Sequence, residues 1–187
     1  MVDPTNFTNF NRSVPELEEL LIFSICVAGK PAIRTAKAIA GLLSYCNDVS
    51  IAPFDIIRWL IKNHLLVHAM EAQGIGQYSR IGRALKEAVE ANLDLRKCSV
   101  ADLEAIHGIG PKTARMFILH TRPNQRIAAL DTHILKFLKT KGHDVPKTTP
   151  SGKRYLTLEQ AFLTEADKSG MTVADFDLHL WRKYSGN

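Results

Sequence analysis

The chain reads Leu-Glu-Ala-Ile-His-Gly-Ile-Gly-Pro-Lys-Thr-Ala from Leu103 to Ala114. The preceding Ser99-Val-Ala-Asp102 is a capping box that predicts a helix start, and the glycines that follow end that helix. Pro111 suits the first position of a second helix, where its missing N–H costs nothing. The sequence therefore predicts a helix-hairpin-helix over about residues 99–121, and this motif decides the fold.

The hairpin itself is Gly108-Ile-Gly110, which allows a tight turn and a close approach to its backbone. Free N–H groups at the start of the second helix, together with the helix dipole, form an anion site. A phosphate held there would position DNA without reading its sequence. A plain corner between two helices is the alternative. The residues predicted to contact DNA at the hairpin are Gly108, Ile109, Gly110 and Thr113.

Two residues near the hairpin are candidates for catalysis. Lys112 lies in the first turn of the second helix, and Asp131 follows 19 residues later, before Thr-His-Ile-Leu. A helix start and partial burial both favour the neutral amine of Lys112, which can attack carbon. Asp131 suits an N-cap, where we expect it to stay ionised and to stabilise positive charge on a sugar. A solvated phosphate contact for Lys112 and a simple cap for Asp131 are the alternatives.

The rest of the chain is predicted to be helical. Apolar residues recur at helical spacing, and prolines and glycines separate the segments. We expect an all-α fold of about nine or ten short helices, without strands or internal repeats. The expected helices lie at about 16–27, 31–45, 54–61, 78–92, 111–121, 131–141, 156–169 and 173–184, with a further helix opening at 99 and a short apolar stretch at 65–70.

Bulk composition is that of a soluble globular protein, with 45% hydrophobic and 23% charged residues among 187. The sequence shows no membrane span and no signal peptide, so we expect an intracellular protein of the cytoplasm or nucleoid, without a membrane partner. The net charge is +5, and six Lys or Arg lie between Lys136 and Arg154. This region includes a basic loop at about 142–155, which is predicted to face phosphates rather than only solvent.

Metal and disulfide sites are not expected. The three cysteines, Cys26, Cys46 and Cys98, are widely spaced and odd in number, which argues for a reduced protein without a disulfide framework. His64 and His68 are four residues apart, but the sequence offers no third ligand, so zinc is not predicted. A monovalent cation that bridges hairpin carbonyls and a phosphate is compatible with the motif.

These motifs resemble a known family. Ile106–Ala114, followed by Ala129-Leu-Asp-Thr-His-Ile134, is similar to the helix-hairpin-helix DNA glycosylase superfamily. The resemblance implies one two-lobed helical unit over 1–187, with the active site in the cleft, Lys112 as the Schiff-base lysine and Asp131 as the essential aspartate. Gly76–Arg83 and Leu20–Leu43 resemble the family's cleft-lining and DNA-inserting segments. Further DNA contacts implied by these segments are Lys30, Tyr78 and Arg80.

Departures from the superfamily pattern indicate the subfamily. No cysteine follows Cys98, so the iron–sulfur cluster of endonuclease III and related enzymes cannot form. Val27-Ala-Gly-Lys30 replaces the usual glutamine in the first inserting loop. The chain most resembles the compact archaeal-type 8-oxoguanine glycosylase/lyases, although it ends Tyr184-Ser-Gly-Asn187 without their terminal lysine. The base pocket implied by this resemblance comprises Phe23, Phe176, Asp177 and Trp181.

The expected function is therefore base excision followed by strand cleavage. The resemblance implies a monomeric enzyme that acts on damaged double-stranded DNA, with 8-oxoguanine as the base it removes through a lysine Schiff base. One alternative keeps this chemistry and changes the base to an oxidised pyrimidine or another modified base. A second alternative is a DNA-binding module without chemistry, in which the hairpin only holds the backbone.

Overall fold

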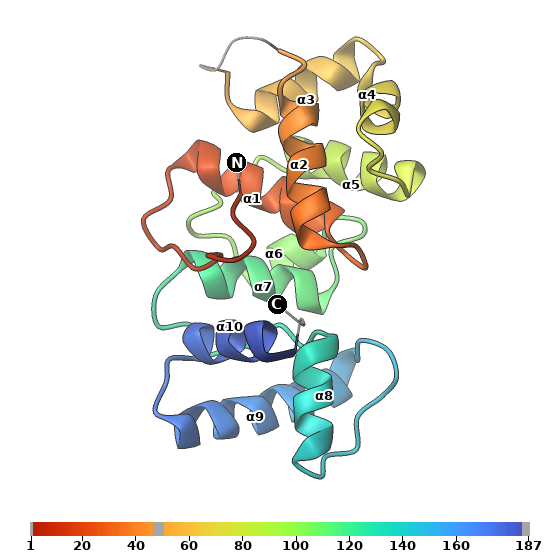
Figure 1. The fold of residues 1–187 in the computed structure, drawn as a ribbon. Helices are drawn as coiled ribbons and strands as arrows, with labels where there is room; N and C mark the ends of the chain where they lie inside the picture. Colours follow the sequence, from red (N-terminus) through yellow and green to blue (C-terminus); the bar gives the residue numbers. More distant parts are fainter. Residues whose placement is uncertain (1, 47–50, 185–187) are drawn as a thin grey trace. The chain divides into compact units, whose positions relative to one another are not determined.

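The computed structural model describes residues 2–46 and 51–184, and in these ranges the fold consists of ten α-helices with no strand (Figure 1). The all-α prediction is confirmed. The described helices are α1 (Val14–Cys26), α2 (Ala32–Leu43), α3 (Pro53–Lys62), α4 (Leu66–Ala72), α5 (Tyr78–Glu90), α6 (Val100–Glu104), α7 (Pro111–Thr121), α8 (Thr132–Thr140), α9 (Gly152–Ser169) and α10 (Val173–Tyr184).

The chain divides into two compact units. Unit 1 comprises Met1–Asn6 and Asn11–Ile109, and unit 2 comprises Phe7–Phe10 and Gly110–Asn187. The boundary between Ile109 and Gly110 falls inside the predicted hairpin, so the chain passes from unit 1 to unit 2 within that turn. Each unit has its own helical core.

Unit 1 is built around α1. This helix begins at Ser13, whose side chain accepts from Glu16 N–H in a capping box. Every residue from Leu20 to Cys26 is buried, which is the pattern of a helix covered on all sides rather than on one face. Helices α2, α3 and α5 all pack against α1, and α4 packs against α3 and α5. The amphipathic α3 and α5 turn their apolar residues toward this central helix.

Unit 2 is built from α8, α9 and α10, which pack against one another, with α7 packed against α10. Their core is aromatic at its centre. Phe176 packs edge-on against Phe137 at 5.6 Å between ring centroids and tilted against Phe162 at 5.3 Å. Offset and edge-to-face contacts of this kind stabilise a core beyond the area that they bury.

The N-terminal segment Phe7–Phe10 belongs to unit 2, although it precedes α1 in the sequence. Asn9 N–H donates to the carbonyl of His120 at 3.1 Å, and the Phe7 ring packs edge-on against the His120 ring. These contacts join the start of the chain to the last turn of α7.

Two sequence predictions need a comment: the extent of the basic loop, whose boundary differs in the structure, and the C-terminal tail, which lies mostly outside the described residues. Helix α9 begins at Gly152 rather than near 156, so the basic loop predicted at 142–155 ends at Ser151. The last three residues of the tail Tyr184–Asn187 lie outside the described residues. Among the described helices, none is both long and apolar enough to cross a membrane.

Candidate active site

The first helix of the hairpin begins as the sequence predicts. Ser99 caps α6 by accepting from Asp102 N–H at 3.1 Å, and the Asp102 carboxylate accepts from Ser99 N–H at 2.7 Å. Ile109 N–H then closes the turn onto the carbonyl of Ile106. Gly108 has φ +79°, where a side chain is strained, and a Cβ there would lie 3.3 Å from Arg80 Nη1. The fold itself therefore requires glycine at this position.

Gly110 is different, because nothing in the described protein explains it. Its φ of −94° suits any residue, and an added Cβ would meet no atom within 4 Å. Gly110 is the N-cap of α7 and has no side chain that could cap the helix. The N–H groups of the first turn, which include those of Lys112 and Thr113, are thus left for an external acceptor.

Lys112 occupies the second position of α7, directly after Pro111. Its side chain is partly buried, and Nζ donates to the thioether sulfur of Met116 at 3.1 Å, which is a weak acceptor. Burial lowers the pKa of the Lys112 ammonium below its usual range, while the negative charges of Asp131 and Asp177 raise it. The environment favours the neutral, nucleophilic amine, in the direction that the sequence predicts.

Asp131 is the N-cap of α8. Its Oδ1 accepts from His133 N–H at 2.9 Å and from Ile134 N–H at 2.8 Å. The prediction that capping keeps this carboxylate ionised is incomplete, because burial raises the pKa of Asp131 and the charge of Asp177 raises it further. The Ile134 N–H and the Lys112 ammonium lower this pKa, but they do not outweigh burial.

Asp177 of α10 is held by a chain of hydrogen bonds. His120 Nε2 lies 3.1 Å from Asp177 Oδ2, and His120 Nδ1 lies 2.8 Å from Thr8 Oγ1. A carboxylate only accepts, so Nε2–H donates to Asp177 and the Thr8 hydroxyl can donate to Nδ1. Asp177 Oδ1 is buried and has no hydrogen-bond partner among the described residues. We call Lys112, Asp131 and Asp177 the Lys112 cluster.

A second group of charged side chains, the Arg115 cluster, comprises Arg115, Tyr155 and Glu159. Arg115 Nε donates to Glu159 Oε1 at 2.9 Å, and the Arg115 guanidinium lies 4.5 Å from the centre of the Tyr155 ring. Glu159 Oε1 also accepts from Ala128 N–H at 2.8 Å. The Tyr155 hydroxyl donates to the carbonyl of Ala128 at 2.6 Å and accepts from Leu130 N–H at 3.1 Å. This cluster fixes the backbone that leads into Asp131.

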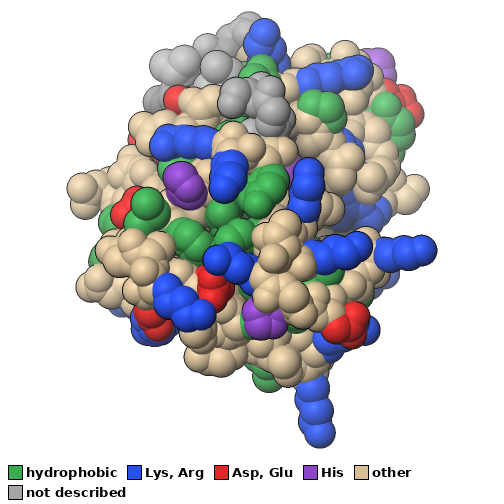
Figure 2. All heavy atoms as spheres, turned by 60° about the horizontal axis from the view of Figure 1, so that its bottom comes forward, with side chains coloured by type: hydrophobic (Ala, Val, Ile, Leu, Met, Phe, Trp, Pro, Cys, Tyr) green, Lys and Arg blue, Asp and Glu red, His purple; other side chains and the backbone are tan. Residues whose placement is uncertain are grey.

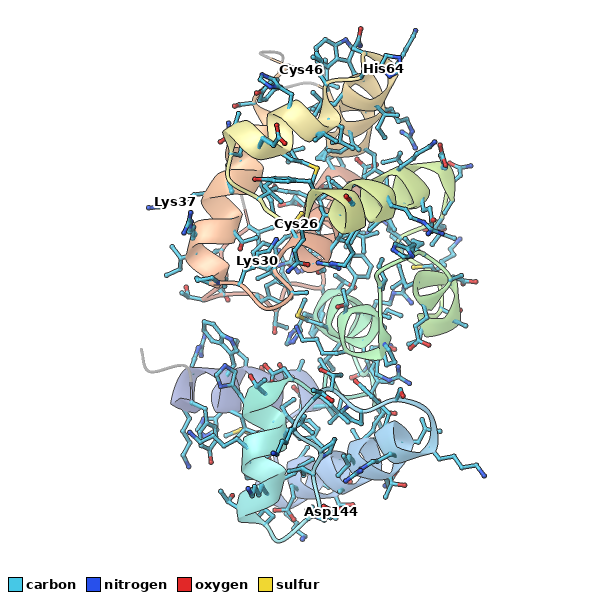
Figure 3. All side chains as sticks on the ribbon, turned by 90° about the vertical axis from the view of Figure 1, so that its right-hand side faces the viewer. Cys26, Lys30, Lys37, Cys46, His64 and Asp144 are labelled. Atoms are coloured by element: carbon cyan, nitrogen blue, oxygen red, sulfur yellow. The ribbon has the colours of Figure 1, made fainter. Side chains whose placement is uncertain are left out.

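The predicted DNA contacts of unit 1 are placed as follows. Lys30 Nζ donates to the carbonyl of Ile75 at 2.6 Å, and burial lowers the pKa of its ammonium. Figure 3 labels Lys30 close to Cys26, whereas Lys37 points outward from α2. Arg80 donates to Gln77 Oε1 at 2.6 Å and, at 3.4 Å, to the carbonyl of Gly108, which joins it to the hairpin. Tyr78 is partly buried at the start of α5.

A cavity of about 170 Å³ opens beside Lys30 in unit 1. Its lining includes Lys30 and Arg34, together with Thr35 and the backbone around Gly74 and Ile75. Two cations at one small cavity make this part of unit 1 suited to an anion.

The predicted base-pocket residues do not share one environment. Phe23 is buried in unit 1 and Phe176 in the aromatic core of unit 2, so packing accounts for both rings. Trp181 is partly buried one helical turn after Asp177 on α10, on the same helix face. Asp177 and Trp181 thus lie on one face of α10, and their role in holding a base stays a prediction.

Some of the basic side chains between Lys136 and Arg154 form ion pairs within the protein. Arg154 Nη2 lies 2.8 Å from Asp144 Oδ2, and Lys141 Nζ lies 3.1 Å from Glu165 Oε2. On the face drawn in Figure 2, Lys and Arg side chains are spread widely and acidic side chains are fewer. Residues 2–46 and 51–184 contain no group of three or more His, Cys, Asp or Glu that could hold a metal ion.

Sequence reasoning missed the residues that support the cluster. His120, Thr8 and Met116 were not predicted to belong to the site, nor were Arg115, Tyr155 and Glu159. One signal was present, because Lys112, Met116 and His120 are spaced by four residues and therefore lie on one face of α7. No local pattern connects Thr8 to His120 across 112 residues.

Comparison with known proteins identifies the family of this chain. The family described as 8-oxoguanine DNA glycosylase (Ogg-HhH) matches residues 5–171. The 8-oxoguanine DNA glycosylase/AP lyase of Thermotoga sp. strain RQ2 is 38% identical over 81 residues, which are 42% of this chain and 38% of that protein. The corresponding protein of Picrophilus torridus is 35% identical over 79 residues, 42% of this chain and 37% of that protein. The matched region thus spans less than two-fifths of either relative.

Solved structures of similar proteins show the same fold. The 8-oxoguanine DNA glycosylase of Thermotoga maritima superimposes with a TM-score of 0.69 at 23% identity, covering 92% of this chain and 81% of that one. The Methanocaldococcus jannaschii 8-oxoguanine glycosylase/lyase, in complex with a 15mer DNA containing 8-oxoguanine, gives a TM-score of 0.72 at 20% identity and covers 97% and 87%. With the family match over most of its length, this chain belongs to the Ogg-HhH family of 8-oxoguanine DNA glycosylases.

Proposed function

We propose that this protein is a DNA glycosylase with AP lyase activity, which removes 8-oxoguanine from double-stranded DNA through a Schiff base on Lys112. The observation that carries the proposal is the state of Lys112. Its amine lies in a partly buried position against a thioether, with its pKa lowered by burial and two carboxylates near it. A lysine of this kind is suited to attack carbon rather than to hold a phosphate by charge.

The chemistry follows from the residues of unit 2. The neutral amine of Lys112 attacks the anomeric carbon of the flipped nucleotide, and the glycosidic bond breaks with its electron pair leaving on the base. An ionised Asp131 stabilises the positive charge that develops on the sugar. The attached nitrogen then loses a proton, and the C1′–O4′ bond opens with O4′ taking up a proton, which gives the Schiff base. The Schiff base makes the neighbouring sugar proton acidic, and removal of that proton expels the 3′ phosphate and cuts the strand.

Contacts to the DNA backbone are proposed at the hairpin and in unit 1. Gly110, which the fold itself does not require, lets a phosphate approach the N–H groups of α7, with Thr113 in the same turn. Lys30, Tyr78 and Arg80, together with Gly108 and Ile109, are the further contacts. A monovalent cation at the hairpin carbonyls would suit this arrangement. We expect a monomer that works on chromosomal DNA in the cytoplasm or nucleoid.

The test is borohydride trapping on three duplexes, which carry 8-oxoguanine, an abasic site, or no lesion. The wild-type protein should form a covalent adduct on the first two, and Lys112→Gln should form none while binding DNA with nearly unchanged affinity. Lys37→Gln is the matched control, because Lys37 is exposed and points outward from α2 (Figure 3). It should trap as the wild type does.

Other outcomes identify the alternatives. Trapping on the abasic duplex alone would keep the lysine mechanism and indicate a different base, which competition among oxidised purines and pyrimidines would find. No adduct on any duplex, with DNA binding intact, would contradict the mechanism and leave a binding module. In either case binding should weaken steeply with added salt, because phosphate contacts release counterions.

A further inference from the structure

The cavity beside Lys30 is lined by positive charge that unit 1 does not neutralise. Its lining contains two cations, Lys30 and Arg34, and no acidic residue. Glu71, the acid nearest in the sequence to the lining residue Gly74, is not part of the lining. Arg34 is exposed, and it forms no hydrogen bond or ion pair with any residue in 2–46 and 51–184. The counter-charge for this cavity must therefore come from outside these residues.

The two cations lie beside the same short segment of backbone. Lys30 Nζ donates to the carbonyl of Ile75 at 2.6 Å, and Arg34 Nη2 lies 3.9 Å from the position that a Cβ on Gly74 would occupy. An ammonium has three donors, and Lys30 uses one of them in its bond to Ile75, so two remain for a ligand. The bond to Ile75 thus holds the Lys30 ammonium at the cavity, and the donors of Arg34 are available there as well.

A third cation of unit 1, Arg80, has a buried donor without an acceptor. Its Nε donates to Gln77 and its Nη1 to Gly108, but Nη2 is buried and has no hydrogen-bond partner in the described part of the chain. A buried donor without a partner is costly, and native structures usually satisfy such a group. Burial lowers the pKa of the Lys30 ammonium, and the positive charge of Arg80 lowers it further. An anion bound at Lys30 would reduce this repulsion between the two cations.

The chemistry of the cavity fits a phosphate. The guanidinium of Arg34 presents a planar fork of donors that matches two oxygens of a phosphate, and Lys30 adds a point charge. The side chains of Lys30 and Arg34 only donate and a phosphodiester only accepts, whereas a base is uncharged and would leave both cations without a counter-charge. The cavity of about 170 Å³ is roughly ten times what one water needs, so it has room for such a group.

We propose that Lys30 and Arg34 form a phosphate site in unit 1, which binds one phosphodiester of the DNA backbone. This inference rests on the proposed function, because it takes DNA as the substrate. The phosphate contact proposed at the start of α7 belongs to unit 2, whereas Lys30, Arg34, Gly74 and Ile75 all belong to unit 1. Each unit then binds the DNA backbone through a site of its own, and neither site reads the base sequence.

The experiment measures the affinity of the full chain for an undamaged duplex between about 50 and about 200 mM salt. Arg34→Gln should lower the affinity roughly tenfold at the lowest salt and reduce the slope of log affinity against log salt by about 1. Lys37→Gln is the matched control, because Lys37 is an exposed cation of the same helix that does not line the cavity and points outward in Figure 3. It should change neither quantity. Equal changes in the two variants, or no change in either, would overturn the proposal.

A second measurement probes the site without DNA. Inorganic phosphate, compared with chloride at equal ionic strength, should raise the Tm of the wild type and of Lys37→Gln by about 2 °C more than that of Arg34→Gln. If Arg34→Gln loses this effect but keeps the salt slope of the wild type, DNA is not the occupant and the site holds a free phosphate. Neither measurement uses a lesion or the chemistry of Lys112, so a failure of this proposal is distinct from a failure of borohydride trapping.

Discussion

The Arg115 cluster and the Lys112 cluster lie in the same unit and draw on the same helix, yet they are built in opposite ways. In the Arg115 cluster, each charged or phenolic group has a well-placed partner, and Glu159 and Tyr155 also bind backbone groups of residues 128–130. In the Lys112 cluster, the amine donates to the weak acceptor Met116, and one oxygen of Asp177 has no hydrogen-bond partner within residues 2–46 and 51–184. The comparison teaches that the charges with full sets of partners fix the backbone around the site, whereas the proposed function assigns the chemistry to groups with weak or missing partners.

The largest stability effect should come from the Arg115 cluster. Glu159→Gln leaves the Arg115 guanidinium buried without its counter-charge, and we expect a loss of about 3 kcal/mol in unfolding free energy. For a chain of this size, that loss corresponds to a fall in Tm of roughly 6–12 °C. Thermal melting measures it, and Asp167→Asn, which breaks an exposed pair, should change Tm very little. An unchanged Tm in Glu159→Gln would remove the distinction between the clusters.

The next effect concerns activity with little change in stability. Asp131→Asn keeps an N-cap, since asparagine caps a helix as well as aspartate does, but it removes the negative charge that the proposed function places beside the sugar. Trapping should slow roughly 100-fold. Burial raises the folded-state pKa of Asp131 above its usual 3.8, so the native state binds the proton more tightly than the unfolded chain. Wild-type stability should therefore fall as pH rises from 3.8 through that raised value, and Asp131→Asn should lack this loss.

Removing the proposed nucleophile should stabilise the fold. Lys112→Met replaces a partly buried amine with an apolar side chain of similar length beside Met116, and we expect a gain of about 1 kcal/mol at neutral pH. Because the folded-state pKa of Lys112 is lowered from 10.5, the wild type gains stability as pH rises from that lowered value toward 10.5. The advantage of the variant should shrink over this window. Chemical denaturation at several pH values tests it, and a less stable variant at neutral pH would be contrary evidence.

The smallest effect belongs to the hydrogen bond that ends the His120 chain. Thr8→Val keeps the shape of the side chain and removes the hydroxyl that bonds His120 Nδ1. We expect a loss of about 1 kcal/mol, read from the urea midpoint, and a reduction in trapping of only a few-fold. A Thr8→Val protein that traps as slowly as Asp131→Asn would show that Thr8 does more than orient the ring.

Most of the fold could be predicted from the sequence because its helix boundaries are marked by local chemistry. Pro111 begins α7, Ser99 caps α6 and Asp131 caps α8, all of which the residues themselves specify. The start of α9 was missed, because Gly152 and its neighbours form the first turn without a side-chain cap that a sequence pattern would show. We infer that caps, more than hydrophobic spacing, made the prediction accurate.

The candidate site could be predicted only in part. Lys112 and Asp131 belong to a motif with fixed spacing, so the sequence alone is enough to predict them as candidates. The contacts of Asp177 to His120 and of Glu159 to Ala128 join positions 57 and 31 residues apart, and only tertiary packing brings them together. The burial that raises the pKa of Asp131 is likewise a property of the packed unit, which a helix-cap argument cannot contain.

The place of Phe7–Phe10 in unit 2 has a consequence for the order in which the chain folds. These residues leave the ribosome before Asn11–Ile109 of unit 1, but Thr8 meets His120 only after 112 further residues have been made, which takes roughly 6–20 s at common rates of synthesis. Unit 1 ends at Ile109 and can complete its core during that interval. Unit 2 can then complete its packing only by binding Phe7–Phe10, which were synthesised before most of unit 1. The folding of unit 2 is therefore the step that deletion of Phe7–Phe10, or a fusion next to them, should disturb most.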